Sequence, residues 1–409
     1  MATSGLPTVP AVAFPVRMLA TVLTLALGWV FIYLDRTTLY PLLPVIGKEF
    51  RLTGTQQGAI ASAYFFTYVA LQMPSGVLGD RFGLKRVLMA MYALAGLGML
   101  AIGLLARSYP LLLVFVALHA VGAGAYYSTS YGITVSSVTP ERRGVSSAIV
   151  TVGMASGLAL GLSLPPLLYQ AMGSWRGPFV LLGFCTLALL PMFWVGVQGR
   201  PMSAGPAGSL GRLFRHRGLV LLGIASFFIL WSQWVTLTWA PSFLYQERGL
   251  NLRQAGLYSA VVALPGVVGA LTWGRLSDRL GRRRLLGVLL PFTVASLVGV
   301  ALLRQPALLA LALGGFGLTG ALALNPLIVS WAGDMALKRP DLGVGTAIAG
   351  INALAVGSSI VAPVVSGRIL DITGSLEGAF FLGALCVAVG WAILWAVPEE
   401  GVEGRGRAL

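Results

Sequence analysis

Two adjacent charged residues, Asp35 and Arg36, lie inside an apolar run that extends from about residue 17 to residue 47. If one helix covers this run, Arg36 lies only about 6 Å along the axis from its midpoint, at a rise of 1.5 Å per residue. An ionisable group at that depth is costly and usually faces a partner or a water-filled cavity. A guanidinium stays charged and matches carboxylate or phosphate oxygens in a bidentate manner. Arg36 is therefore our first candidate for binding an organic anion.

A structural interpretation of the same pair stays open. Residues 18–34 alone are barely long enough to cross a membrane, in which case Asp35 and Arg36 lie at the membrane interface. Adjacent residues on a helix point about 100° apart, so the two side chains need not pair with each other.

Several apolar runs carry aromatic and polar residues at a spacing of three or four positions, so that these side chains share one helical face. Such stripes often serve packing or form the aromatic belt at the membrane interface, and that alternative stays open for each residue. Two asparagines in later runs are further polar candidates. Besides Arg36, the candidates for contacting a substrate are Tyr33, Tyr40, Tyr64, Gln72, His119, Tyr126, Tyr127, Trp234, Thr238, Asn325 and Asn352.

The composition excludes a water-soluble fold. Of the 409 residues, 57% are hydrophobic and only 10% are charged, against about a quarter charged in soluble domains. A soluble fold cannot cover that much apolar surface, and a chain this apolar is not disordered. A membrane-spanning helix needs about 20 apolar residues. The apolar runs predict twelve such helices, at approximately 17–47, 55–79, 86–106, 110–137, 144–171, 177–197, 219–246, 253–278, 285–303, 306–333, 344–370 and 378–398.

Basic residues are distributed unevenly between the two sides that twelve spans define. The net charge of +15 comes from 28 Lys and Arg against 13 Asp and Glu, which in a soluble protein would suggest nucleic acid. Here nineteen basic residues fall in loops on one side and eight on the other, and only Arg36 remains inside a span. Because cytoplasmic loops collect Lys and Arg, we predict that both termini are cytoplasmic in a cell inner membrane. The bias of Lys and Arg toward the cytoplasmic loops then accounts for the positive net charge, and we expect the protein to contact the lipid bilayer and not nucleic acid.

One loop motif occurs twice at an offset of 198 residues. Gly76-Val-Leu-Gly-Asp80-Arg81-Phe-Gly83-Leu-Lys85-Arg86 follows the second span, and Gly274-Arg-Leu-Ser-Asp278-Arg279-Leu-Gly281-Arg-Arg283-Arg284 follows the eighth. The repeat predicts two parallel six-span halves, residues 1–197 and 219–409, joined by a cytoplasmic linker at residues 198–218. Parallel halves with a site between them are a transporter architecture.

The repeated loops are candidate gating elements, because an Asp can pair with arginines or a helix N-terminus and hold one access state until rocking breaks the contact. A simpler interpretation is that the loops only fix topology and anchor the protein to anionic lipid. The candidate gating residues are Gly76, Asp80, Arg81, Gly83, Arg86, Gly274, Asp278, Arg279, Gly281 and Arg283.

This loop pattern, G-x-x-x-D-R-x-G-x-[KR]-[KR], resembles the signature loop of the major facilitator superfamily, and the second copy, the twelve spans and the central linker agree. The resemblance covers essentially the whole chain. It implies an all-α membrane protein with twelve transmembrane helices in two pseudo-symmetric six-helix halves. It also implies transport by rocker-switch alternating access.

The first two spans are more closely similar to the anion:cation symporter family. The similarity rests on Tyr33-Leu-Asp35-Arg36, on the segment from Ser62 to Phe66 and on Gln72-Met-Pro74-Ser-Gly76. The resemblance implies transport of small organic anions such as sugar acids, carboxylates and phosphate esters, commonly with protons. It also implies that Arg36 contacts the anion and that Asp35 takes part in proton coupling.

The fourth span departs from that family. The family often has an Arg and a Glu at positions that here are Leu118 and Ala125. Histidine is the side chain whose unperturbed pKa lies closest to neutral pH, so without that glutamate His119 is a second candidate for proton coupling beside Asp35. Glycines at 153, 157 and 161 in the fifth span form a face for close helix packing.

The leading hypothesis is a proton-coupled secondary transporter of a small organic anion, acting as a monomer. One alternative is a drug/proton efflux antiporter for amphipathic compounds, favoured by the aromatic pathway. Another is a membrane sensor that does not transport. We expect no enzyme activity, cofactor or metal, because the chain has only two histidines and two cysteines and shows no catalytic cluster.

Overall fold

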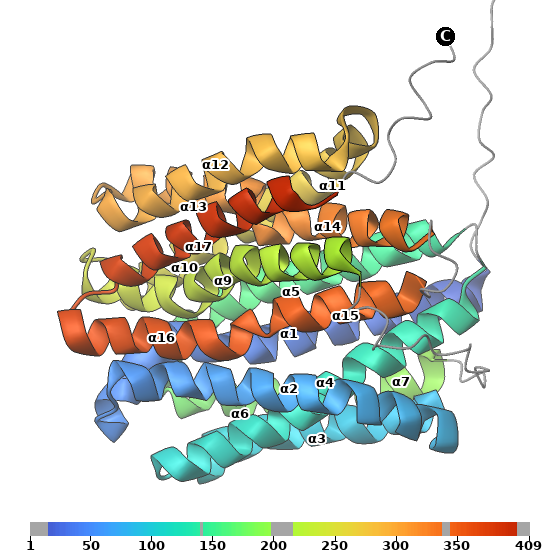
Figure 1. The fold of residues 1–409 in the computed structure, drawn as a ribbon. Coiled ribbons are helices and arrows are strands. Elements are labelled where there is room, and N and C mark those ends of the chain that lie inside the picture. Colours follow the sequence, from blue (N-terminus) through green and yellow to red (C-terminus); the bar gives the residue numbers. More distant parts are fainter. Residues whose placement is uncertain (1–14, 140–141, 198–215, 338–343, 399–409) are drawn as a thin grey trace, which may run out of the picture.

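The computed structural model describes residues 15–139, 142–197, 216–337 and 344–398, and within these ranges it consists of α-helices and short connections, without a strand (Figure 1). The helices are α1 (Val16–Phe50), α2 (Gly54–Phe82), α3 (Leu84–Leu105), α4 (Tyr109–Ser137), α5 (Arg143–Met172), α6 (Arg176–Ala188), α7 (Leu190–Gly196), α9 (Arg217–Gln246), α10 (Leu252–Ala260), α11 (Ala263–Leu280), α12 (Arg282–Leu302), α13 (Pro306–Thr319), α14 (Ala321–Leu337), α15 (Val344–Val356), α16 (Ser358–Thr373) and α17 (Glu377–Ala396).

Each predicted span corresponds to one helix or to two consecutive helices. Four spans are divided, into α6 and α7, α10 and α11, α13 and α14, and α15 and α16. Pro191 lies in the first turn of α7, and Gly320 between α13 and α14 has an extended backbone, with φ −82° and ψ −174°. Proline lacks an N–H, and glycine loses more backbone entropy in a helix than other residues do. The apolar runs alone did not reveal these breaks.

Eleven helical segments of the described chain are long and apolar enough to cross a membrane. The remaining predicted span is α2, which has 29 residues and is therefore about 43 Å long. Its buried Tyr64 and Tyr68 and its half-buried Gln72 make it less apolar than the others. These polar residues of α2 are turned partly inward, away from the surrounding lipid.

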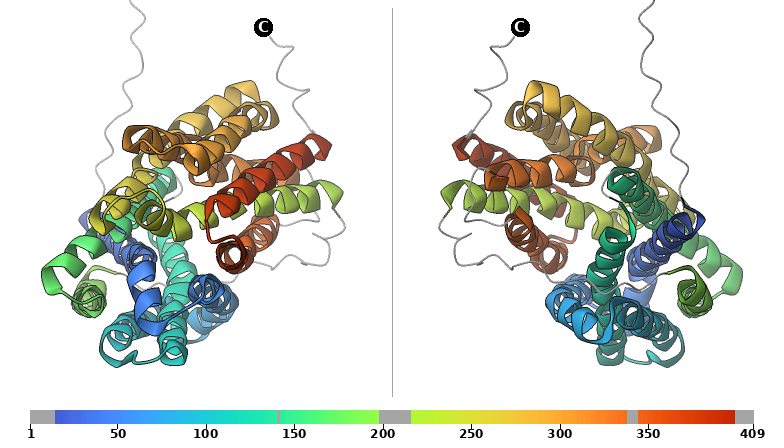
Figure 2. Two further views of the ribbon diagram at one scale, coloured as in Figure 1. Left: turned by 90° about the vertical axis from the view of Figure 1, so that its left-hand side faces the viewer. Right: turned by 90° about the vertical axis from the view of Figure 1, so that its right-hand side faces the viewer.

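The helices form two groups along the chain, which Figure 2 shows from both ends of the bundle. Helices α1 to α7 pack mainly on one another, as in α1 on α5 and α3 on α4. Helices α9 to α17 do the same, as in α9 on α17 and α11 on α14. The main contacts between the groups are α2 with α16, α5 with α10, and α1 with α9.

Both groups begin and end at one end of the bundle. The hydroxyl of Thr21, near the start of α1, donates to the carbonyl of Gly196 at 2.8 Å, and Gly218 at the start of α9 lies beside Pro398. The ammonium of Lys85, in the first repeated loop, donates to the carbonyl of Trp194 at 2.6 Å. We call this end the Asp80 end, and the opposite end the Asp371 end.

The repeat is visible in contacts at the Asp80 end. Lys85 contacts the carbonyl and the indole of Trp194 in α7. Arg283, which lies 198 residues further on, donates to the carbonyl of Trp395 in α17 and lies over its ring at 5.0 Å. Each copy of the motif therefore joins its own loop to the last helix of its own group.

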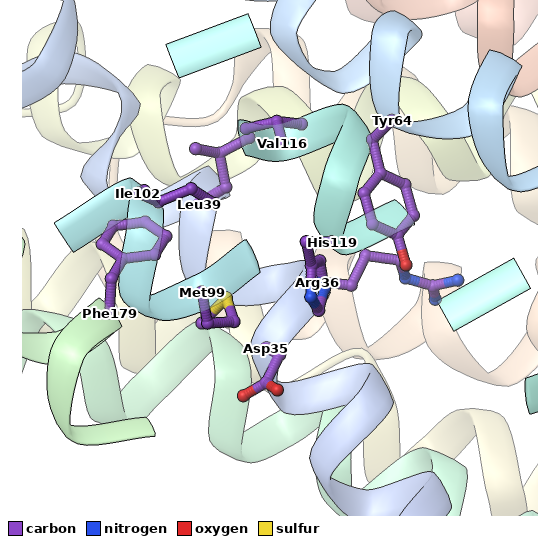
Figure 3. Close-up of a pocket in the computed structure, with 9 residues that line it drawn as sticks. All are labelled: Asp35, Arg36, Leu39, Tyr64, Met99, Ile102, Val116, His119 and Phe179. Carbon is purple, nitrogen blue, oxygen red and sulfur yellow. The ribbon is translucent and has the colours of Figure 1, made fainter. Parts of the chain in front are cut away.

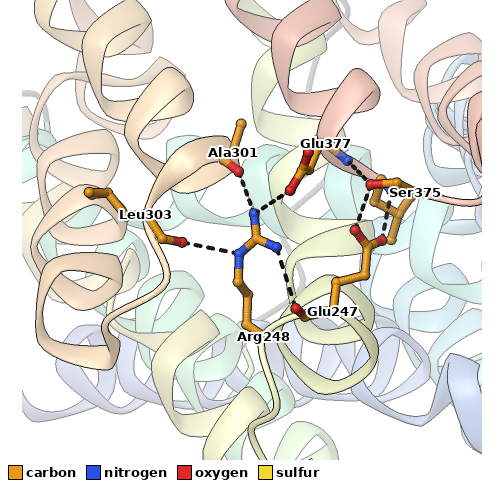
Figure 4. Close-up of polar contacts among 7 residues, drawn as sticks. Glu247, Arg248, Ala301, Leu303, Ser375 and Glu377 are labelled. Atoms are coloured by element: carbon orange, nitrogen blue, oxygen red, sulfur yellow. Dashed lines mark hydrogen bonds and ion pairs between the residues drawn. The ribbon is translucent and has the colours of Figure 1, made fainter.

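A second pair of equivalent contacts ties the helices together at the Asp371 end. In the first group, Glu49 pairs with Arg176 at 2.8 Å, and Arg176 also donates to the carbonyl that follows α3 at 3.0 Å. In the second group, the buried Arg248 pairs with Glu377 at 2.9 Å and donates to carbonyls at the end of α12 (Figure 4). Glu247, 198 residues after Glu49, accepts hydrogen bonds at the start of α17.

The predicted glycine face of α5 is confirmed. A Cβ atom at Gly153 would lie 2.5 Å from the carbonyl oxygen of Ala26, and one at Gly157 would lie 2.2 Å from that of Val30. Helices α1 and α5 therefore approach backbone to backbone. This contact fixes α1, the helix that carries Asp35 and Arg36.

Candidate functional site

Arg36 lies near the middle of α1, which continues without interruption to Phe50. The residue is 6% exposed, and its guanidinium makes no hydrogen bond or ion pair with the described residues. Its carbon Cζ lies 4.0 Å from the ring centroid of Tyr33, 5.5 Å from that of Phe65 and 5.7 Å from that of Trp234. Aromatic faces attract a cation but leave its N–H donors free. The donors of Arg36 are therefore available to an anion.

The aromatic surroundings of Arg36 come from both helix groups. Tyr33 and Phe65 belong to α1 and α2, and Trp234 belongs to α9. The rings of Phe65 and Trp234 are 4.3 Å apart, so they close the space beside the guanidinium across the contact between the groups. Arg36 thus lies where a relative movement of the groups changes its environment.

A narrow pocket reaches from Arg36 into the first helix group, and its free space is about that of one water molecule. Four of its lining residues are polar, and the other five form an apolar wall (Figure 3). The lining residues are Asp35, Arg36, Leu39, Tyr64, Met99, Ile102, Val116, His119 and Phe179.

Asp35 does not pair with Arg36, which confirms that these neighbours point in different directions on the helix (Figure 3). Its Oδ2 accepts a hydrogen bond from the hydroxyl of Thr186 in α6 at 2.7 Å. Its Oδ1 has no partner among the described residues. A carboxyl that is 2% exposed and half satisfied can exist in a protonated and an ionised form, with one oxygen free to hold the proton.

His119 lies in α4, on the wall of the same pocket. Its Nδ1 is 3.0 Å from the carbonyl oxygen of Ala95, so in a neutral ring Nδ1 carries the proton and Nε2 is an acceptor. Within the described part of the chain, Nε2 has no hydrogen-bond partner, and neither does the hydroxyl of Tyr64, whose ring centroid lies 5.6 Å from that of the histidine. The pocket therefore brings three of the predicted residues, Asp35, His119 and Tyr64, next to Arg36.

Other predicted contact residues are placed elsewhere. Tyr126 is fully buried in the first group, where its hydroxyl donates to the carbonyl of Leu25 at 2.7 Å. Tyr127 is half-buried, with its ring 4.9 Å from that of Tyr131. Tyr40 and Thr238 are buried, Gln72 and Asn352 are half-buried, and Asn325 is exposed. None of these seven lines the pocket.

Two residues at the site escaped the sequence analysis. Phe65 contacts both Arg36 and Trp234, and Thr186 binds Asp35. A phenylalanine in an apolar run is usually a packing residue, although the position of Phe65 beside Tyr64 in the segment from Ser62 to Phe66 could have marked it as a candidate. Thr186 is 151 residues from Asp35, and nothing in a single sequence shows that pairing.

The repeated loops turn through glycines. Gly83 has φ +91° and Gly281 has φ +86°, a backbone that L side chains rarely adopt. Asp80 is exposed and makes no ion pair with a described residue, whereas Asp278 lies 3.6 Å from Arg282, which itself pairs with Asp334 at 2.7 Å. Arg81, Arg86 and Arg279 are exposed, and Arg283 is half-exposed. A Cβ at Gly76 or Gly274 would meet open space.

The opposite end joins the two helix groups closely. Asp371 near the end of α16 accepts hydrogen bonds from the N–H groups of Gly54 and Thr55 at 2.5 and 2.9 Å, and from the Thr55 hydroxyl. It thereby caps the first turn of α2. A Cβ at Gly367 would lie 2.1 Å from the carbonyl oxygen of Gly54, and one at Gly58 would lie 2.2 Å from that of Pro363. The groups are in backbone contact at this end.

Known proteins resemble the chain over most of its length. A probable sulfoacetate transporter of Cupriavidus necator is 29% identical over 393 residues, which cover 88% of this chain and 88% of the relative. The hexuronate transporter of Bacillus subtilis is 26% identical over 405 residues, with coverage of 92% and 94%. These relatives are transporters of organic acids and not enzymes.

The fold is also known. A bacterial homolog of the human lysosomal transporter Spinster, solved in an inward-facing and occupied conformation, matches with a TM-score of 0.79 at 15% identity, covering 94% of this chain and 97% of the other. The model of the Major Facilitator Superfamily matches residues 25–341. The chain is a multi-pass membrane protein that belongs to the Major Facilitator Superfamily.

Proposed function

We propose that the protein is a proton-coupled secondary transporter of a small organic anion, such as a carboxylate, a sugar acid or a phosphate ester. The observation that carries this proposal is the state of Arg36. A buried guanidinium without an anionic partner is costly unless the site has a use for its charge. Two relatives carry the anions sulfoacetate and hexuronate, which supports an anion as the partner of Arg36.

Proton coupling is assigned to the polar wall of the pocket. Asp35 and His119 each offer one unpartnered atom, and both lie beside Arg36. A proton bound on this wall adds positive charge next to the anion site, so proton and anion binding favour each other. The substrate contacts that we propose besides Arg36 are Tyr33, Tyr64, Trp234 and Thr238, with the other predicted contact residues joining as the groups move.

The protein is expected to lie in a bacterial inner membrane with the Asp80 end in the cytoplasm. That end carries most of the basic residues of the described chain, and the described chain begins and ends there. The close contact of α2 with α16 then seals the outside, while Asp80 makes no ion pair with a described residue. This arrangement corresponds to an inward-facing state, in which the gating contacts of the Asp80 loops are released.

The moving parts are proposed to be residues 1–197 and 219–409, and the linker 198–218 lies mostly outside the described residues. Helix contacts run mainly within each part. Arg36 and the residues around it come from one chain, so a monomer contains the whole site.

Transport by purified protein in liposomes tests the proposal. The wild type should accumulate labelled organic anions when an inward proton gradient is imposed, and Arg36→Ala should abolish this uptake. Arg304→Ala is the matched control, because Arg304 is exposed in the turn between α12 and α13. Uptake that survives in Arg36→Ala would show that the site is elsewhere, whereas uptake of amphipathic cations alone would favour the efflux alternative.

A further inference from the structure

We infer that one face of α9 forms the second half of the substrate site and reads neutral oxygen atoms of the anion. This face, the α9 stripe, consists of Trp231, Trp234, Thr238 and Ser242. The inference rests on the proposed anion transport and adds to it a substrate class, a monoanion that carries hydroxyl groups.

The polar groups of α9 divide into two sets according to the face on which they lie. Nε1 of Trp231, Nε1 of Trp234, Oγ1 of Thr238 and Oγ of Ser242 are all buried and have no hydrogen-bond partner among the residues that the structure describes. With about 100° per residue, these four positions fall within an arc of about 80°. The α9 stripe is therefore a continuous line of unsatisfied polar groups.

The buried polar side chains on the rest of α9 are satisfied. The hydroxyls of Ser226, Ser232 and Thr236 donate to carbonyls of their own helix at 2.6 to 2.8 Å. Nε1 of Trp239 donates to the carbonyl of Pro363 at 3.1 Å. Serine and threonine can bond to the preceding turn in any helix, so the lack of such bonds at Thr238 and Ser242 distinguishes this face.

The stripe lies against the Arg36 site. Trp234 is 5.7 Å from the guanidinium carbon and 4.3 Å from the ring of Phe65, and α9 packs on α1. Both indoles are 7% exposed and both hydroxyl residues are 0% exposed. Unpaired polar groups destabilise a closed helix contact. Separation of α1 from α9 exposes the stripe, and a substrate in that space supplies the missing acceptors.

The chemistry of the stripe limits the substrate. The chain from Gly218 to Gln246 contains no charged residue, so this part of α9 offers indole N–H and hydroxyl groups and no second cation. Arg36 binds one anionic group, and the stripe binds neutral oxygens at the other end of the molecule. A hydroxylated monocarboxylate fits this pattern. A dianion should bind less well, because its second charge would lie among the neutral donors of the α9 stripe. A fatty acid without hydroxyls should also bind less well, because it leaves those donors without an acceptor.

Three probes with six carbon atoms each separate these classes: D-gluconate, which has hydroxyls and one carboxylate, hexanoate, which has no hydroxyl, and D-glucarate, which has two carboxylates. Calorimetric titration of the purified full-length protein should show the tightest binding for gluconate. Thr238→Val and Trp234→Phe should each weaken gluconate binding about three- to tenfold, the range for one hydrogen bond, and leave hexanoate binding unchanged. Ser242→Ala provides a further variant if one of these fails to fold.

The same helix supplies matched controls. Thr236→Val and Trp239→Phe remove the same groups from the satisfied faces and should not change the preference for gluconate over hexanoate. The thermal transition of Thr238→Val should stay the same or rise, because its hydroxyl has no partner to lose.

The outcomes that would contradict this inference differ from the outcome that would contradict the proposed function. If the wild type binds gluconate and hexanoate equally and the stripe variants change neither, this inference is wrong while anion binding stands. If gluconate and hexanoate weaken together in Thr238→Val, the residue is structural and the inference is also wrong. If the wild type binds none of the three anions, the proposed function itself fails.

Discussion

The guanidinium of Arg36 is buried against aromatic rings and makes no ion pair with a described residue. Tyr33, Phe65 and Trp234 surround its guanidinium, while the carboxyl of Asp35 is directed toward Thr186. A structural arginine at this depth would be expected to pair with a carboxylate. If Arg36 is the proposed anion site, its unpaired charge lowers the stability of the ligand-free protein, which leads to a prediction.

Arg36→Met should raise the thermal stability of the ligand-free protein. Methionine keeps the packing against the three rings and removes an unpaired buried charge, a change that is often neutral or stabilising. The shift expected is a few degrees, at about 2–4 °C per kcal/mol. A fluorescence-based melting curve in detergent measures it, and a large fall in the melting temperature would show that Arg36 is a structural residue.

Asp35→Asn and His119→Ala should separate coupling from binding. The residue that carries the proton is needed for accumulation against a gradient, but not for exchange of anion for anion. The variant that removes it should lose uptake driven by a proton gradient and retain exchange in preloaded liposomes. If both variants accumulate anion as well as the wild type does, the proton is carried elsewhere.

The chemistry of single residues could be predicted at this site, but their partners could not. Arg36, Asp35 and His119 are conspicuous because charged and titratable groups are rare in apolar runs. Phe65 and Thr186 are ordinary residues for a membrane helix, and only the fold brings them to the site. Tyr126 shared a helical face with His119, yet the structure uses it for packing, because periodicity identifies a face without showing what lies opposite.

At the scale of the elements, glycines allow α1 to pack on α5 and α2 to pack on α16, and the carboxylate of Asp371 joins α16 to α2. The glycine face of α5 was readable from a four-residue repeat, and the structure packs it on α1. The contact of α2 with α16 was not predicted: Gly54 and Gly58 in α2 are also four residues apart, but nothing in a single sequence shows that they meet Pro363 and Gly367 of α16. The helix breaks were also missed, since hydrophobic periodicity continues across them.

Asp371→Asn should open the Asp371 end. The carboxylate caps α2 from the other helix group, and loss of a cap costs about 1 kcal/mol, which shifts the ratio of open to closed forms about fivefold. Spin labels at Lys48 and Ile372, both exposed, should report a larger population at long distance. Cys185 and Cys386 are replaced beforehand.

Glu377→Gln is the matched control for this measurement. Glu377 is a carboxylate at the same end, but it pairs with Arg248 inside one helix group, so its loss should leave the distance distribution unchanged. An unchanged distribution of spin-label distances in Asp371→Asn would show that the cap does not hold α2 and α16 together at the Asp371 end.

At the scale of the whole molecule, two similar groups of helices meet at the site. The offset of 198 residues seen in the loops recurs in the pairs Lys85 with Arg283 and Glu49 with Glu247, which make equivalent contacts. Composition and repeats were enough to predict this architecture, because membrane spans and loop motifs are local signals. The access state could not be predicted, since it depends on contacts between distant segments.

The orientation of the protein can be tested with single cysteines in a background without native ones. Arg279→Cys at the Asp80 end and Arg304→Cys at the Asp371 end are both exposed positions. A membrane-impermeant maleimide should label position 304 in intact cells and position 279 only after permeabilisation, because the basic end is expected in the cytoplasm. The reverse pattern would contradict the inward-facing assignment.

Binding of an organic anion to the purified protein tests the central claim most directly. Calorimetric titration with D-gluconate should give a measurable dissociation constant for the wild type and for Arg304→Ala. Arg36→Met, which is expected to fold, should weaken binding by a hundredfold or more, about 2.7 kcal/mol, because no other cation lies against the α9 stripe within the described part of the chain. Equal binding by Arg36→Met and the wild type would contradict the assignment of Arg36 as the anion site.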